Sequence, residues 1–141
     1  MKNSTEWSPR GIGEQILRTA SRGPNGAAGI YGRSVAGTAL RWFAMGRSGR
    51  RVLLTAAHHA NEWITAPLLM RFAGELAAGT WPGALDDTRV WFAPLVNPDG
   101  VNLVTGQLTS GSLYENAQSI VRSFRRCLSP TAGRPTYAGW I

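Results

Sequence analysis

The sequence predicts an α/β protein built on a partial mixed twisted sheet with flanking helices. Three observations favour this fold class. Residues 51–57 form a short continuous apolar run, typical of a strand buried on both faces of a sheet. An apolar helical pattern follows, and residues 89–96 then form a second strand-like run. A strand, a helix and a strand in this order predict a βαβ unit, whose two strands are parallel.

The chain before this unit contributes a weaker pattern. Residues 1–29 are poorly patterned, although a short helical stripe is possible, formed by Ile12, Ile16, Leu17 and Ala20. Residues 31–35 and 39–45 suggest two strands, the second rich in aromatic side chains. Residues 46–49 contain two glycines and suggest a hairpin connection to the strand at 51–57.

The central helix is predicted from an apolar repeat of four residues. Gly79 should end this helix, and Asn61 and Thr65 are both candidates for its N-cap. The predicted buried stripe consists of Ile64, Leu68, Phe72 and Leu76.

The chain after residue 96 loses its regular pattern. Residues 97–100, Asn-Pro-Asp-Gly, favour a structural turn over a catalytic site. A short helix is possible around residues 114–124, and residues 128–141 should be irregular. We therefore divide the chain into a poorly patterned segment (1–29), a partial domain (30–104) and a divergent, irregular tail (105–141).

Composition narrows the classes of protein. The 141 residues suit one modest domain or part of a larger one, and no run of about 18 apolar residues predicts a membrane span. No signal peptide is apparent at residues 1–7, so the cytoplasm is the default location. Cys127 is the only cysteine, which excludes an internal disulfide. The net charge of +7 comes from scattered arginines, so we favour a solvated surface over a nucleic-acid-binding module.

The most informative residues are the only two histidines, His58 and His59, and the carboxylate of Glu62. An imidazole and a carboxylate three residues apart, as in His59 and Glu62, can bind one zinc ion from the same turn of backbone. By itself this spacing is common on protein surfaces. Here it follows a buried strand and precedes a helix, where α/β proteins tend to place ligand sites. In extended backbone His58 would point the opposite way, so a structural or orienting role is favoured for it.

Three segments together resemble a known family. The stretch His-His-Ala-Asn-Glu-Trp-Ile-Thr at 58–65 resembles the zinc-binding region of the zinc carboxypeptidases, the carboxypeptidase A-like metallopeptidases. The amino-acid sequence of this stretch is most similar to that of the bacterial γ-D-glutamyl–diamino-acid endopeptidases, which cut peptidoglycan peptides. Residues 32–37 and 94–102 resemble the strand-and-turn segments on either side, in register from about residue 31 to 103. The three occur in the family's order, which makes the resemblance specific.

The resemblance implies that His59 and Glu62 are the first two ligands of one zinc ion. The family's third ligand is a downstream histidine, and its general base is a later glutamate. This chain has no histidine after His59, and no segment resembles the region of the base or of the oxyanion-binding arginines. The catalytic residues are therefore unknown, because the general base and oxyanion residues are not present in this chain.

The resulting hypothesis is a zinc-dependent metallopeptidase of the carboxypeptidase type. Its substrate would be a peptide or a cell-wall peptide, and the chain alone is expected to be truncated and inactive. The main alternative is a non-catalytic fragment or binding protein that retains the fold, and a basic nucleic-acid-binding module is less favoured. The sequence leaves exopeptidase or endopeptidase specificity and the oligomeric state open.

Overall fold

The computed structural model describes residues 9–127. The chain divides into two compact units, residues 1–108 and residues 109–141. The second unit contains one described helix, α4 (Ser112–Cys127). The first unit contains, in chain order, α1 (Pro9–Arg22), β1 (Ala27–Arg33), β2 (Ala39–Gly46), β3 (Arg50–Thr55), the 3-10 helix η2 (Ala60–Glu62), α2 (Thr65–Ala77), β4 (Thr88–Ala93) and α3 (Pro98–Val104).

The four strands form one mixed sheet in the order β1-β2-β4-β3. β3 and β4 are parallel, with Val52 opposite Val90, so the predicted βαβ unit and the α/β fold class are confirmed. β2 runs antiparallel to both of its neighbours, β1 and β4. The predicted hairpin connection at residues 46–49 is wrong, because β4 lies between β2 and β3. Turn residues signal a change of chain direction, but they do not specify which strand becomes the partner.

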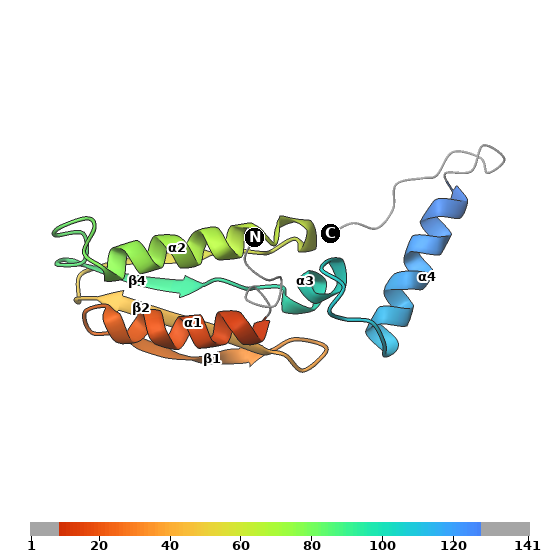
Figure 1. Cartoon of the computed structure of the whole chain (residues 1–141), viewed down its shortest axis with the longest axis horizontal. Helices are drawn as coiled ribbons and strands as arrows, with labels where there is room; N and C mark the ends of the chain where they lie inside the picture. Colours follow the sequence, from red (N-terminus) through yellow and green to blue (C-terminus); the bar gives the residue numbers. More distant parts are fainter. Residues whose placement is uncertain (1–8, 128–141) are drawn as a thin grey trace. The chain divides into compact units, whose positions relative to one another are not determined.

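Two helices, α1 and α2, pack on the same face of the sheet (Figure 1). The possible stripe on α1 is confirmed for Ile12, Ile16 and Ala20, which are buried, whereas Leu17 is exposed. Beneath the helices, the rings of Phe43 and Phe92 stack with their centroids 4.6 Å apart. α1 therefore adds its apolar face to the same hydrophobic core as the sheet.

The buried face of α2 differs from the predicted one. Leu76 is buried, but Ile64 and Leu68 are 60% and 67% exposed, and Phe72 is also partly exposed. A four-residue repeat advances about 400° around a helix, so three repeats rotate the stripe by about 120°, from solvent at Ile64 to the core at Leu76. The residues that face the core are instead Ala66, Met70, Ala73 and Leu76.

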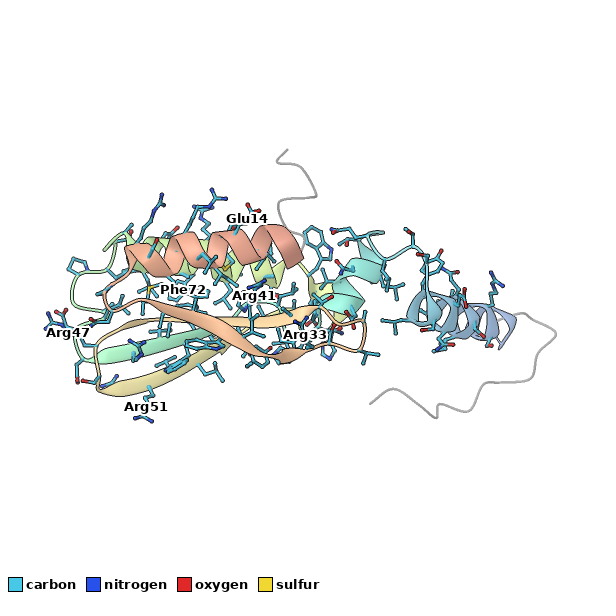
Figure 2. All side chains as sticks on the ribbon, turned by 90° about the horizontal axis from the view of Figure 1, so that it is seen from below. Glu14, Arg33, Arg41, Arg47, Arg51 and Phe72 are labelled. Carbon is cyan, nitrogen blue, oxygen red and sulfur yellow. The ribbon has the colours of Figure 1, made fainter. Side chains whose placement is uncertain are left out.

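The second face of the sheet has no helix over it within the described part of the first unit. Figure 2 shows α1 and α2 on one side of the sheet and Arg51 on the other. Trp42 and Trp91 lie in tilted contact on this second face, with ring centroids 4.7 Å apart. Leu53, on the edge strand β3, is 67% exposed.

The tail is partly ordered into α4, which confirms the possible helix at residues 114–124. α4 carries exposed apolar side chains at Ile120 and Val121. Residues 128–141, expected to be irregular, lie outside the described residues. Within residues 9–127, no helix is long and apolar enough to cross a membrane.

Candidate metal site

The candidate site begins where β3 ends and its backbone leaves the sheet. Beyond Thr55 the chain stays paired with the end of β4, because the Ala56 amide donates to the Ala93 carbonyl at 3.1 Å. The Val96 amide in turn donates to the carbonyl of Ala56 at 3.1 Å. Ala56 and Ala57 are both buried. The strand ends are therefore fixed in the core where the chain turns outward at Ala57.

Ala57 makes this outward turn in an unusual backbone conformation. Its φ is +52°, in the left-handed region, where a residue with a Cβ costs roughly 1–2 kcal/mol. Both backbone polar groups of Ala57 have partners. Its amide donates to Thr65 Oγ1 at 2.9 Å, and its carbonyl accepts from the Asn97 amide at 3.0 Å. Strain of this kind persists only when the surrounding structure holds it, and it is concentrated at functional sites.

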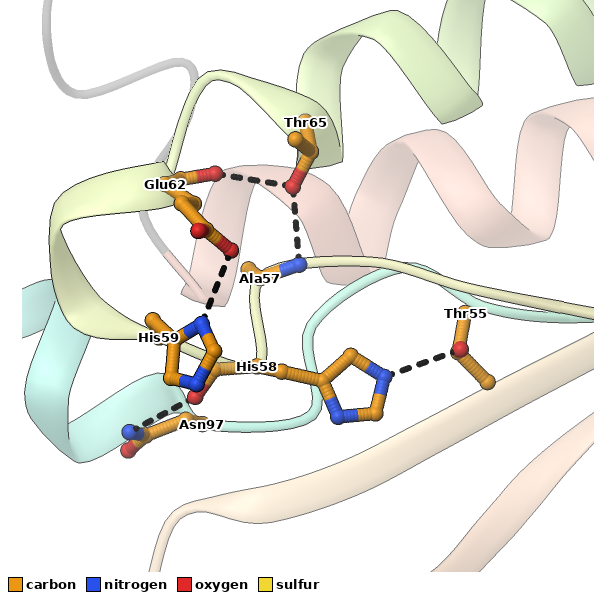
Figure 3. Close-up of polar contacts among 7 residues, drawn as sticks. All are labelled: Thr55, Ala57, His58, His59, Glu62, Thr65 and Asn97. Atoms are coloured by element: carbon orange, nitrogen blue, oxygen red, sulfur yellow. Dashed lines mark hydrogen bonds and ion pairs between the residues drawn. The ribbon is translucent and has the colours of Figure 1, made fainter.

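The turn brings His59 and Glu62 together. His59 is extended (φ −91°, ψ 141°) and precedes η2, whose backbone returns so that the Glu62 amide donates to the His59 carbonyl at 3.1 Å. The side chains then face one another, with 3.1 Å between His59 Nδ1 and Glu62 Oε2 (Figure 3). Their side chains are 76% and 52% exposed, so the pair is open to solvent.

The spacing of the two atoms suits a shared metal ion. Zinc–nitrogen and zinc–oxygen bonds of about 2.0–2.1 Å at a tetrahedral angle place two donor atoms about 3.3 Å apart. The observed 3.1 Å is close to this, and an imidazole with a carboxylate is an appropriate donor pair for zinc. A catalytic zinc also needs a third protein ligand and a water. Within residues 9–127, no group of three or more His, Cys, Asp or Glu side chains could hold a metal ion.

His58 does not join the pair. Its ring lies back along the strand, with Nε2 2.9 Å from Thr55 Oγ1 (Figure 3). The carbonyl of His58 accepts a hydrogen bond from Asn97 Nδ2 at 3.2 Å. His58 thus contributes its backbone to the frame of the site, while its side chain turns away from Glu62.

The Asn-Pro-Asp-Gly segment supports the site from the next strand. Asn97 caps α3, because its Oδ1 accepts from the Gly100 amide at 2.9 Å. Asp99 is buried, and its carboxylate accepts from Ser34 Oγ at 2.7 Å and from the Ala36 amide at 2.9 Å. The segment therefore has a structural role: it connects α3 to the β1–β2 turn and to residues 57–62, the loop that carries His59 and Glu62 and is called the metal loop below.

Sequence reasoning missed the role of Thr65. Neither Asn61 nor Thr65 caps α2, because the N-cap is Ile64 and it makes no side-chain cap bond. Thr65 instead accepts from Ala57 and donates to the Glu62 carbonyl at 2.8 Å. No spacing rule links a threonine in a first helical turn to a strand end eight residues earlier, so the sequence offered no signal for this contact.

Comparison with known proteins agrees with this geometry. The family model for zinc carboxypeptidases matches residues 18–126. The chain belongs to the zinc carboxypeptidase family. The match includes β3, the metal loop and α2, and it confirms the family resemblance inferred from the three sequence segments.

One curated relative and two solved structures are similar to the chain. It is 36% identical over 83 residues to γ-D-glutamyl-L-diamino acid endopeptidase 1 of Lysinibacillus sphaericus, covering 52% of this chain and 21% of the relative. It resembles carboxypeptidase A of Helicoverpa armigera, with a TM-score of 0.61 and 19% identity, covering 69% of this chain and 26% of that structure. It also resembles a metallo-carboxypeptidase from Burkholderia cenocepacia, with a TM-score of 0.58 and 17% identity, covering 85% of this chain and 38% of that structure.

The structural likenesses show a carboxypeptidase A-like fold and confirm the fold class. The chain spans about a fifth of the length of the curated relative and between a quarter and two fifths of these two solved structures. The assignment of His59 and Glu62 as zinc ligands stays a prediction.

Proposed function

We propose that this chain carries part of the zinc centre of a metallopeptidase that hydrolyses peptide or peptidoglycan-peptide bonds. In this proposal His59 and Glu62 are two ligands of one zinc ion. One observation carries the proposal: His59 Nδ1 and Glu62 Oε2 lie 3.1 Å apart in a solvent-open loop, in a chain of the zinc carboxypeptidase family.

Each residue has a defined part in this proposal. When bound, zinc lowers the pKa of a coordinated water and polarises the carbonyl oxygen of a scissile bond. His59 would supply a neutral imidazole through Nδ1, and Glu62 would supply a carboxylate oxygen. The described residues include no third ligand group, so zinc should bind weakly and the isolated chain should not turn over substrate.

The substrate class is proposed from the curated relative. That relative is named for an endopeptidase that acts at a γ-D-glutamyl-L-diamino acid bond. We favour a cell-wall peptide over a general C-terminal peptide for the complete metallopeptidase. The alternative is a non-catalytic protein that retains the fold. The absence of a third donor beside His59 and Glu62 within residues 9–127 favours this alternative for the chain alone.

Zinc titration of three alanine variants tests the proposal. His59→Ala and Glu62→Ala should each abolish the binding of one zinc ion, because each removes one of two donors. His58→Ala is the matched control, since it removes a neighbouring imidazole that faces Thr55 and not Glu62. Binding of cobalt(II), followed by its visible absorption spectrum, gives a second readout: His59→Ala and Glu62→Ala should lose the spectrum of the bound ion, and His58→Ala should keep it.

Three results would contradict the proposal in different ways. Absence of zinc binding by the unaltered chain would remove the metal site. An equal loss of zinc affinity in His58→Ala and His59→Ala would contradict the assignment of His59 as the ligand. Hydrolysis of a γ-D-glutamyl–diamino acid peptide by the unaltered chain would contradict the expected inactivity. Strong salt-dependent binding of DNA or RNA would instead favour the nucleic-acid-binding alternative.

A further inference from the structure

We propose that Thr65 is a positioning residue that holds the zinc-binding loop in its ligand-ready shape. This inference rests on the proposed function, since it concerns how His59 and Glu62 are presented to the metal. The hydrogen bonds of the Thr65 hydroxyl go to backbone groups and not to either of the two side chains. It acts through the backbone on both sides of them.

The hydroxyl of Thr65 connects the two ends of the loop. It accepts a hydrogen bond from the Ala57 amide at 2.9 Å and donates one to the Glu62 carbonyl at 2.8 Å (Figure 3). A hydroxyl has one donor and two acceptor positions, so a single side chain can satisfy both contacts. Valine has the same shape and can make neither. The loop that contains both proposed ligands is thus closed by one oxygen atom.

The loop is anchored from its other side by Asn97. The backbone amide of Asn97 donates to the Ala57 carbonyl at 3.0 Å, and its side-chain Nδ2 donates to the His58 carbonyl at 3.2 Å. Ala57 is therefore held at its amide by Thr65 and at its carbonyl by Asn97. These two contacts maintain its left-handed backbone, with φ of +52°.

The conformation of Ala57 determines where His59 lies. A change at Ala57 from the left-handed region to an ordinary one would redirect the chain that follows it. His59 would then move relative to Glu62, whose carbonyl is fixed from the same hydroxyl. Loss of the Thr65 hydroxyl should therefore separate the two donor atoms, even though both side chains remain in the protein.

The test compares Thr65→Val with Thr65→Ser and with a matched control, Thr105→Val. Thr105 also donates a hydroxyl hydrogen bond to a carbonyl, that of Val101, at 2.7 Å, but it is the C-cap residue of α3 and lies outside the loop. For each variant of the full chain, the zinc Kd and the midpoint of thermal unfolding without metal are measured. The two measurements separate an effect on the site from an effect on the fold.

The expected result is a change in zinc affinity that is specific to Thr65. Groups that orient metal ligands typically contribute 10–100-fold to affinity, and we expect Thr65→Val to weaken zinc binding about tenfold. Thr65→Ser should restore most of the affinity. Thr105→Val should lower the unfolding midpoint and change the zinc Kd less than about twofold. Equal zinc Kd values in the two valine variants, or no recovery in the serine variant, would overturn the inference.

Hydrogen exchange at the Ala57 amide separates this inference from the proposed function. Exchange should be slow in the unaltered chain and in Thr65→Ser, and it should become fast in Thr65→Val. If the unaltered chain binds no zinc, the proposed function fails, and the exchange result alone decides whether Thr65 holds the loop. Unchanged protection of Ala57 in Thr65→Val would refute the positioning role whatever the zinc result.

Discussion

Replacing Asp99 by asparagine is a direct test of how the metal loop is supported. Asp99 is 8% exposed, and its carboxylate accepts two hydrogen bonds, one from the Ser34 hydroxyl and one from the Ala36 amide. Asparagine has one acceptor oxygen in place of two. It can still accept from Ala36, but it must then present an NH₂ group to the Ser34 hydroxyl, which loses its acceptor.

The size of the effect follows from these two contacts. Hydrogen bonds to a charged group contribute about 1.5–3 kcal/mol each, and neutral ones about 1 kcal/mol. The loss of charge at both contacts predicts a decrease of about 1–3 kcal/mol in the free energy of unfolding for Asp99→Asn. Asp99→Ala should cost more, about 2–4 kcal/mol, because both donors of these partly buried hydrogen bonds lose their acceptor. Either loss is a large share of the 5–15 kcal/mol that is typical of a folded domain.

Urea unfolding measures this decrease. With a slope of about 1 kcal/mol/M for a unit of this size, the midpoint for Asp99→Asn should fall by about 1–3 M. Asp86→Asn is the control, since Asp86 is exposed and its loss should change stability by less than about 0.5 kcal/mol. A double-mutant cycle with Ser34→Ala should give a coupling energy of at least about 1 kcal/mol. Equal midpoints for the two asparagine variants, or a coupling near zero, would refute the reasoning.

Three further predictions concern the backbone, the open sheet edge and pH. Gly46→Ala should destabilise the chain by more than about 2 kcal/mol, because Gly46 has φ +99° and an added Cβ would collide with the Thr88 carbonyl. Gly37→Ala is the control and should cost about 1 kcal/mol, because Gly37 has φ +83° but lies in open space. Equal urea midpoints for the two variants would contradict this prediction. β3 is an edge strand with an exposed Leu53, so we expect the chain to self-associate through it, and Leu53→Lys should reduce that association in sedimentation. No self-association of the unaltered chain, or equal association of both proteins, would contradict this expectation. Partial burial raises the pKa of Tyr31 above its ordinary 10.0, although the residue is 50% exposed, so the folded chain retains this proton slightly more strongly than the unfolded chain. Stability should therefore fall modestly as the pH rises above 10. Tyr31→Phe should flatten this decline, and an identical decline in both proteins would contradict the assignment.

The parts of the fold that the sequence predicts are those encoded by local patterns. The apolar run at 51–57 and the helix that follows it describe a βαβ unit, and the parallel pairing of β3 with β4 follows from that unit. The position of β4 between β2 and β3 is not encoded locally. It depends on which strands bury more surface together, and the turn residues at 46–49 carry no information about that choice.

The same distinction applies to the candidate site. The spacing of His59 and Glu62 is local, and the 3-10 helix between them brings the two side chains face to face. The groups that hold the loop are distant in sequence. Asn97 reaches the His58 carbonyl from 39 residues away, and Thr65 reaches back eight residues to Ala57. Such contacts arise from the fold as a whole, so sequence reasoning interpreted Thr65 as a cap and Asn97 as part of a turn.

The structure separates the groups proposed to bind metal from the groups that place them. His59 and Glu62 are exposed, and their replacement removes one solvent-screened contact, so the fold should lose little stability. Thr65 and Asn97 bond to backbone groups of the loop, so their replacement should change both its shape and its stability. A variant that loses zinc with an unchanged unfolding midpoint therefore identifies a ligand. A variant that loses affinity together with protection of the Ala57 amide identifies a part of the frame, and these two patterns assign each residue without reference to catalytic turnover.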